Sequence, residues 1–107
     1  MNEKLYSFIY KMAAQLNITK ITTSQEIDPN FSAYLVDASA GHMSLTLPDI
    51  TYDGLWLLFR RVDTVVTNFV IISGYTPSQT IEGAASVPLP VGGEGATVSF
   101  NGVWKRI

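Results

Sequence analysis

The chain has 107 residues, of which 47% are hydrophobic and only 15% are charged, and its formal net charge is −2 at pH 7. This length fits one domain, and the charged share lies below the roughly 25% of an average domain, so we expect copies of the chain to associate. The charge disfavours a nucleic-acid binder, which normally carries a basic stripe, and the lack of cysteine excludes a disulfide framework and a thiolate metal site.

Residues 3–17 are predicted to form a helix, because four apolar side chains recur at helical intervals. They form a candidate helical seam with the rhythm of a coiled coil: Leu5, Ile9, Met12 and Leu16. Such a short helix is marginal alone. It either packs on its own domain or forms a short stem shared between chains; the remaining alternative is a disordered tail.

The N-terminal segment is not expected to be a signal peptide, because its longest uncharged stretch before Lys11 is only Leu5–Tyr10. No segment approaches the roughly 20 apolar residues that span a bilayer. We therefore expect no signal peptide and no membrane insertion.

Residues 18–32 are polar and broken by Asp28-Pro29-Asn30, which predicts a linker with one short strand near residues 18–22. We accordingly divide the chain into an N-terminal helix and linker, residues 1–32, and a β-domain, residues 33–107.

From residue 33 onward, apolar and polar residues alternate in short runs, which predicts strands. These cover residues 34–37, 43–47, 55–61, 69–73, 79–82, 86–91, 96–100 and 103–107. The first two are predicted to form a hairpin, and Asn101-Gly102 is a strong signal for another. Residues 86–91 contain two prolines and therefore predict an edge strand or an extended segment. The spacing is typical of a small antiparallel β-sandwich, similar to a jelly roll.

The run Leu55–Phe59 is apolar on both faces of its strand. Leu57 and Phe59 point to one side, whereas Trp56 and Leu58 point to the other. Either a second sheet or another copy of the chain is therefore expected to cover the second face.

Several short motifs occur in an order that resembles small β-domains of viral fibres. They are Tyr34-Leu-Val-Asp37, Leu45-Thr-Leu-Pro48, Gly54, Phe59-Arg-Arg-Val-Asp63, Val70-Ile-Ile, Thr80-Ile-Glu-Gly83, Val98-Ser-Phe100 and Gly102-Val-Trp104. The similarity is to C-terminal head domains of tailed-phage fibres and of fibre or collagen-like surface proteins of large DNA viruses. It covers residues 33–107 and implies a trimeric β-sandwich at a fibre tip. The family's long shaft has no counterpart in residues 1–32.

The candidate interaction residues fall into two groups. The loops 49–54 and 74–78 carry the candidate receptor-contact residues Tyr52, Asp53 and Tyr75. The candidate inter-subunit residues are Trp56, Leu58, Trp104, Arg60 and Arg61. The aromatic rings in both groups either stack on sugar rings or lie buried between subunits.

The remaining polar residues have simpler expected roles. Arg60 and Arg61 lie on opposite faces of one strand, and we expect an ion pair with Asp63, Asp37 or Glu82. The aspartates at strand ends are expected to cap turns. Phe59, Phe69 and Phe100 are expected in the core. The single histidine, His42, is expected to be a solvated loop residue, because metal sites need several converging ligands.

We expect no enzymatic activity and no cofactor, because no nucleophile elbow or phosphate loop occurs. The resemblance to fibre head domains implies a structural virion protein, made in the host cytoplasm, whose expected partners are other copies of itself, other virion proteins and a host surface glycan or protein. The alternatives are a monomeric carbohydrate-binding module and a capsid or baseplate cement protein.

Overall fold

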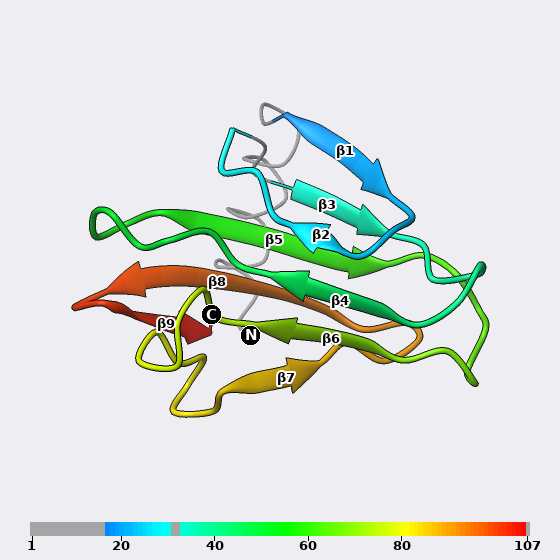
Figure 1. The fold of residues 1–107 in the computed structure, drawn as a ribbon. Coiled ribbons are helices and arrows are strands. Elements are labelled where there is room, and N and C mark those ends of the chain that lie inside the picture. The colour runs from blue at the N-terminus through cyan, green and yellow to red at the C-terminus, as the bar shows by residue number, and fades with distance from the viewer. Residues whose placement is uncertain (1–16, 31–32, 107) are drawn as a thin grey trace, which may run out of the picture.

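Two β-sheets lie face to face in the computed structural model, which describes residues 17–30 and 33–106 (Figure 1). The helix predicted over residues 3–17, with its seam Leu5, Ile9, Met12 and Leu16, lies outside the described residues apart from Asn17. The strands are β1 (Ile18–Ile21), β2 (Gln25–Glu26), β3 (Ala33–Val36), β4 (Met43–Thr46), β5 (Trp56–Arg61), β6 (Val70–Ser73), β7 (Ser86–Pro88), β8 (Glu94–Phe100) and β9 (Val103–Arg106).

The chain crosses between the two sheets after each of its first five strands. Sheet A has the order β1-β3-β5-β8-β9, and sheet B has the order β2-β4-β6-β7. As a result β1, β3 and β5 run parallel, as do β2, β4 and β6. The later strands β7, β8 and β9 are added antiparallel. Both sheets are therefore mixed, and the predicted antiparallel sandwich is corrected to an all-β fold with two mixed sheets.

The core lies between the sheets, because alternate residues of each strand point inward. In β5 the inward residues Leu57 and Phe59 are buried, as predicted, whereas Trp56 and Leu58 are partly exposed. The largest fully enclosed apolar side chains are Trp104, Phe59, Ile27, Leu45, Leu47, Leu57, Ile81, Val36 and Val70. Burial of these side chains is the main term that stabilises the sandwich.

The predicted hairpin between residues 34–37 and 43–47 is wrong. These residues form β3 and β4, which belong to different sheets, and the loop between them passes from sheet A to sheet B. Alternating patterns and a short glycine loop look the same for a hairpin and for a crossover of this kind. The Asn101-Gly102 hairpin is confirmed: both residues have positive φ, 53° and 77°, and they join the antiparallel strands β8 and β9.

The boundaries of other predicted strands also differ from those in the structure. Residues 79–82 contribute isolated bridges at Ile81 rather than a strand. Residues 18–26, predicted to be linker with one short strand, supply β1 and β2, which pair with β3 and β4. This part of the chain belongs to the sandwich. The predicted edge strand is confirmed as β7, at one edge of sheet B.

Candidate functional site

The two loops predicted to contact a receptor lie at the same end of the sandwich. β4 and β6 run parallel in register, so the loops that follow them leave from the same edge of sheet B. Gln79 joins these loops through its side-chain amide. Its Nε2 donates to Asp49 Oδ1 at 2.6 Å, and its Oε1 accepts from the backbone N–H of Ile50 at 3.2 Å. This link could not be predicted from the sequence, because 29 or more residues separate the partners.

Ser99 fixes the backbone on both sides of Asp53. Its buried hydroxyl donates to the carbonyl oxygen of Tyr52 at 2.7 Å and accepts from the N–H of Leu55 at 3.0 Å. Asp53 Oδ1 accepts from the N–H of Asn101 at 3.0 Å, which ties this loop to the β8–β9 turn. The loop is therefore held by several hydrogen bonds from distant parts of the chain.

Both predicted tyrosines present their rings to solvent at this end, which we call the tyrosine end. The exposed fraction is 59% for Tyr52 and 47% for Tyr75. Asp53 is exposed but has one carboxylate oxygen engaged with the turn. An arrangement of exposed aromatic rings on held loops suits contact with an apolar or sugar surface.

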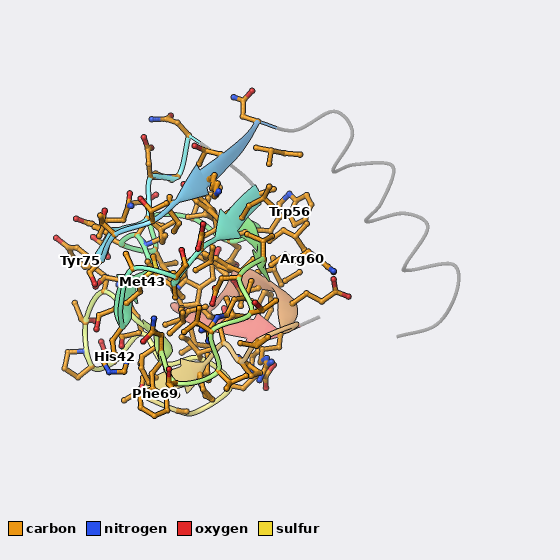
Figure 2. The ribbon with its side chains drawn as sticks, turned by 90° about the vertical axis from the view of Figure 1, so that its right-hand side faces the viewer. His42, Met43, Trp56, Arg60, Phe69 and Tyr75 are labelled. Carbon is orange, nitrogen blue, oxygen red and sulfur yellow. The ribbon has the colours of Figure 1, made fainter. Side chains whose placement is uncertain are left out.

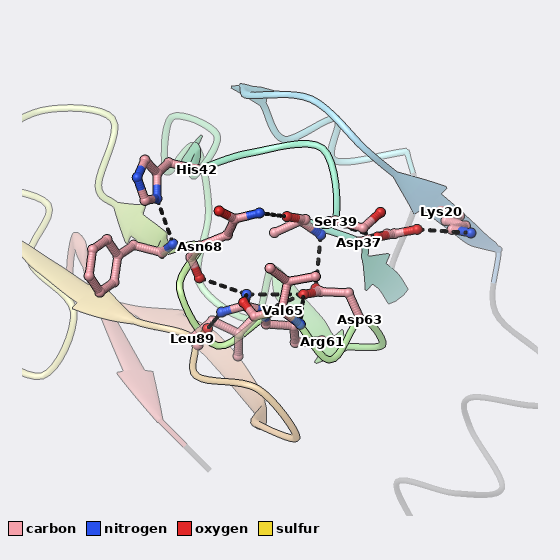
Figure 3. Close-up of polar contacts among 11 residues, drawn as sticks. Lys20, Asp37, Ser39, His42, Arg61, Asp63, Val65, Asn68 and Leu89 are labelled. Carbon is pink, nitrogen blue, oxygen red and sulfur yellow. Dashed lines mark hydrogen bonds and ion pairs between the residues drawn. The ribbon is translucent and has the colours of Figure 1, made fainter.

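A buried ion pair organises the opposite end, which we call the arginine end (Figure 3). Arg61 Nε donates to Asp63 Oδ1 at 2.9 Å, and Nη2 donates to Asp63 Oδ2 at 3.1 Å. The guanidinium also donates to three carbonyl oxygens, those of Leu89, Val65 and Asn68, at 3.1, 3.0 and 2.7 Å. The predicted ion pair with Asp63 is thus present within one chain, and its role is to hold loops together.

The carboxylate of Asp63 is kept ionised by this arrangement. The hydrogen bond from Arg61 is the largest cause that lowers its pKa, and the N–H groups of Ala38 and Val65 act in the same direction. Burial acts against them but is outweighed, so the pKa lies well below its usual range. Asp37 and Asp53 likewise accept backbone N–H groups, as predicted for turn caps.

The outward face of β5 carries three of the predicted inter-subunit residues, Trp56, Leu58 and Arg60. In Figure 2, Trp56 and Arg60 project from one side of the molecule, and Tyr75 lies on the other side. Arg60 forms an exposed ion pair with Glu94 at 2.8 Å.

Two other predicted interface residues are corrected. Trp104 is fully buried by its own chain, and Arg61 is turned inward. Neither has surface to offer a second copy. The alternation of side chains along a strand predicted that the two arginines face opposite ways. Only the packing of the two sheets and their loops decided which of the two arginines is buried.

The single histidine is more than a solvated loop residue. His42 Nδ1 accepts from the N–H of Phe69 at 2.8 Å, and the two rings stack with centroids 5.1 Å apart. The predicted core positions of Phe69 and Phe100 are wrong, because 65% and 53% of these residues are exposed. Phe69 precedes β6 and lies against His42, while Phe100 lies on the outward side of β8.

The described residues contain no group of three or more His, Cys, Asp or Glu side chains placed to hold a metal ion. Within the same part of the chain, no helix has the length and apolar character needed to cross a bilayer.

No family model matches the chain, and no curated protein sequence matches it.

Proposed function

We propose that this chain is a non-enzymatic structural protein of a virus particle, a homotrimeric head domain of a fibre or tail appendage. It serves assembly and attachment to a host surface, and it is made in the host cytoplasm. Support comes from the ordered motifs of residues 33–107, which resemble viral fibre heads, and from the low share of charged residues.

The observation that carries the attachment role is the pair of joined loops at the tyrosine end. Gln79 holds the two loops together, and Tyr52 and Tyr75 expose their rings. Three copies around one axis present three such ends, so weak contacts with a glycan or protein add by avidity. Other virion proteins are the expected partners elsewhere on the molecule.

The trimer is tested by light scattering on the full chain. A solution mass three times the chain mass of 11.7 kDa supports the proposal, and a monomer rejects the fibre-head arrangement. The attachment role is tested with the double variant Tyr52→Ala, Tyr75→Ala on a glycan array and on cells. The matched control is Val66→Ala, an exposed apolar residue in the loop after β5, at the arginine end. Unchanged binding by the double variant contradicts the loop assignment.

The exposed tyrosine rings also favour a second candidate, a monomeric carbohydrate-binding module in which Tyr52 or Tyr75 stacks on a sugar. Selective glycan binding by a monomer supports this alternative over the fibre head. A trimer with no selective glycan binding supports a purely structural head.

A further inference from the structure

The edges of the two sheets are closed in different ways. In the part of the chain that the structure describes, the edge strands are β1 and β9 in sheet A and β2 and β7 in sheet B. An edge strand directs unpaired N–H and C=O groups away from its sheet, where another chain can pair with them, so native proteins usually block such edges. The way in which each edge is closed therefore indicates where a further strand can be added.

The outer edge of β7 is blocked by proline. The N–H of Leu89 donates to the Val70 carbonyl, so in this antiparallel pair Val87 and Leu89 direct their backbone groups at β6. The alternate residues Pro88 and Pro90 face outward and have no N–H to donate. A strand added beside β7 would therefore find few donors.

The outer edge of β9 is covered by the segment that precedes β7. The N–H of Trp104 donates to the Thr80 carbonyl at 2.8 Å, and the Trp104 carbonyl accepts from the N–H of Glu82 at 3.0 Å. The next outward N–H, that of Arg106, donates to the Glu82 carboxylate at 2.7 Å. In sheet B, β2 has only two residues, of which Glu26 alone faces outward. Neither β9 nor β2 therefore offers a run of free backbone groups.

The outer edge of β1 is open among the described residues, at the top of the molecule in Figure 1. The carbonyl oxygens of Asn17 and Ile21 accept N–H groups from the β3 side, so residues 17, 19 and 21 direct their backbone groups at β3. The N–H and C=O groups of Ile18 and Lys20 therefore point away from the sheet, and no described residue bonds to them. Both residues are exposed. Together they form a template for one more extended strand.

The side chains of β1 suit a continuation of sheet A. Ile18 is 50% exposed and lies in one apolar row with Ala33 and Leu58 on the outer face. A lysine on an edge strand commonly opposes pairing with another strand. Here, however, Lys20 Nζ is already paired with Asp37 Oδ2 at 3.2 Å. A strand beside β1 therefore meets an apolar side chain and a lysine whose charge is balanced.

We propose that β1 pairs antiparallel with β1 of a second copy of the chain around a two-fold axis at Thr19, which joins the two copies of sheet A into one sheet. In this register Ile18 of each copy exchanges both of its free backbone groups with Lys20 of the other. The two Thr19 residues face each other between these bonds, and Thr–Thr pairs stabilise adjacent strands. A register centred on Lys20 would instead place two lysines opposite each other, which is destabilising.

A strand of an unrelated protein is the competing occupant of this edge. A second copy is favoured because the register centred on Thr19 keeps like charges apart, and because the low share of charged residues already favours association of copies. The other described edges are closed, so two copies that join edge to edge meet through the same strand. The inference goes beyond the proposed head domain and does not rest on it.

A proline at position 20 tests this pairing, because it removes only a donor that faces outward. The N–H of Lys20 makes no bond to β3, so Lys20→Pro leaves the hydrogen bonds between β1 and β3 in place. We expect self-association, measured by sedimentation over a range of concentrations, to weaken by roughly tenfold to a hundredfold. The matched control Lys20→Thr keeps the N–H and is expected to associate like the natural chain.

Unchanged association of Lys20→Pro, an equal loss in both variants, or a natural chain that stays monomeric at every concentration would overturn the proposal. The solution masses also separate this result from that of the trimer. Pairs of chains that Lys20→Pro dissociates support this inference and reject the trimer, whereas six chains that fall to three support both. Three chains that Lys20→Pro leaves unchanged support the trimer and overturn this inference.

Amide hydrogen exchange on the natural chain provides a second measurement, which decides the matter if Lys20→Pro does not fold. The N–H groups of Ile18 and Lys20 are expected to exchange more slowly as the protein concentration rises, because pairing removes them from water. The control is Ser86, whose N–H faces outward at the edge of β7 and is expected to exchange at the same rate throughout. Exchange at Ile18 and Lys20 that does not depend on concentration would overturn the proposal.

Discussion

Arg61 and Asp63 stand two residues apart in the chain and form a two-pronged ion pair inside the protein, with both side chains only 2% exposed. Asp63 also accepts from the N–H groups of Ala38 and Val65, at 2.8 and 3.1 Å. Asn68 Nδ2 donates to the Ala38 carbonyl at 2.6 Å and closes the network. The pair thereby joins the loops that follow β3 and β5 to the segment at Leu89.

Removing one partner of this pair is expected to destabilise the protein strongly. Asp63→Ala leaves a buried guanidinium without its counter-charge, which costs about 3–5 kcal/mol. Urea denaturation of the variant and the natural chain measures the difference. The control is Glu94→Ala, which breaks the exposed pair with Arg60, whose side chains are 57% and 55% exposed, and which is expected to cost no more than about 1 kcal/mol. Similar losses in both variants would contradict a special role for the buried pair.

The same pair predicts that stability falls in acid. Because the folded state lowers the pKa of Asp63, its contribution is complete above the usual carboxyl pKa of about 3.9 and is lost as the pH falls below it. Urea midpoints measured between pH 7 and pH 2 should fall more steeply for the natural chain than for Asp63→Asn. Parallel curves would show that another carboxylate governs the acid transition.

Tyr34 is expected to lose its phenolic proton only at a pH well above the usual value for tyrosine. Burial is the main cause that raises its pKa to about 12; its hydroxyl donates to the carbonyl of Asp28 and its ring stacks on Phe59. Its contribution to stability is therefore complete below about pH 10 and is lost as the pH rises toward 12. Phenolate absorbance should show a component near pH 12 that Tyr34→Phe lacks and that Tyr52→Phe retains. Tyr34→Phe should also cost about 1 kcal/mol through the lost hydrogen bond.

Gly74 is expected to be required for the shape of the tyrosine end. A β carbon at this position would lie 2.0 Å from the carbonyl oxygen of Gln79, a backbone atom that cannot move alone. Gly74→Ala should cost about 1–3 kcal/mol and weaken any binding that depends on Tyr75. Gly95→Ala is the matched control, because the nearest atom to its β carbon is the end of the Arg106 side chain at 4.0 Å. Equal melting temperatures for the two variants would contradict this reasoning.

The local pattern of the sequence predicted most strands and their faces correctly. Alternation placed Leu57 and Phe59 on one face of their strand and Trp56 and Leu58 on the other, and the Asn101-Gly102 signal predicted the last hairpin. The same alternation misplaced Phe69 and Phe100, because a large apolar ring at the end of a strand can also lie outside the core. It missed β2, whose two residues Gln25 and Glu26 are polar and exposed.

Some residues of the candidate site could be predicted from the sequence, whereas others could not. The tyrosines at the loop tips were predictable, since turn residues mark loops and loops lie at the surface. Gln79, Ser99 and His42 were not, because each bonds a backbone or side-chain group that is distant in sequence. An amide, a hydroxyl or an imidazole acquires such a role only when the partner is brought beside it.

The sequence alone determined the β character of the chain from residue 33 onward, the strand periods, the tight turn at Asn101-Gly102 and the opposite orientations of Arg60 and Arg61. Only the tertiary structure decided that β3 pairs with β1 and β5 rather than with β4, and that Arg61 is the buried arginine. The physical reason is that the period of a strand depends on its own residues, whereas strand pairing and burial depend on residues that are distant in the chain.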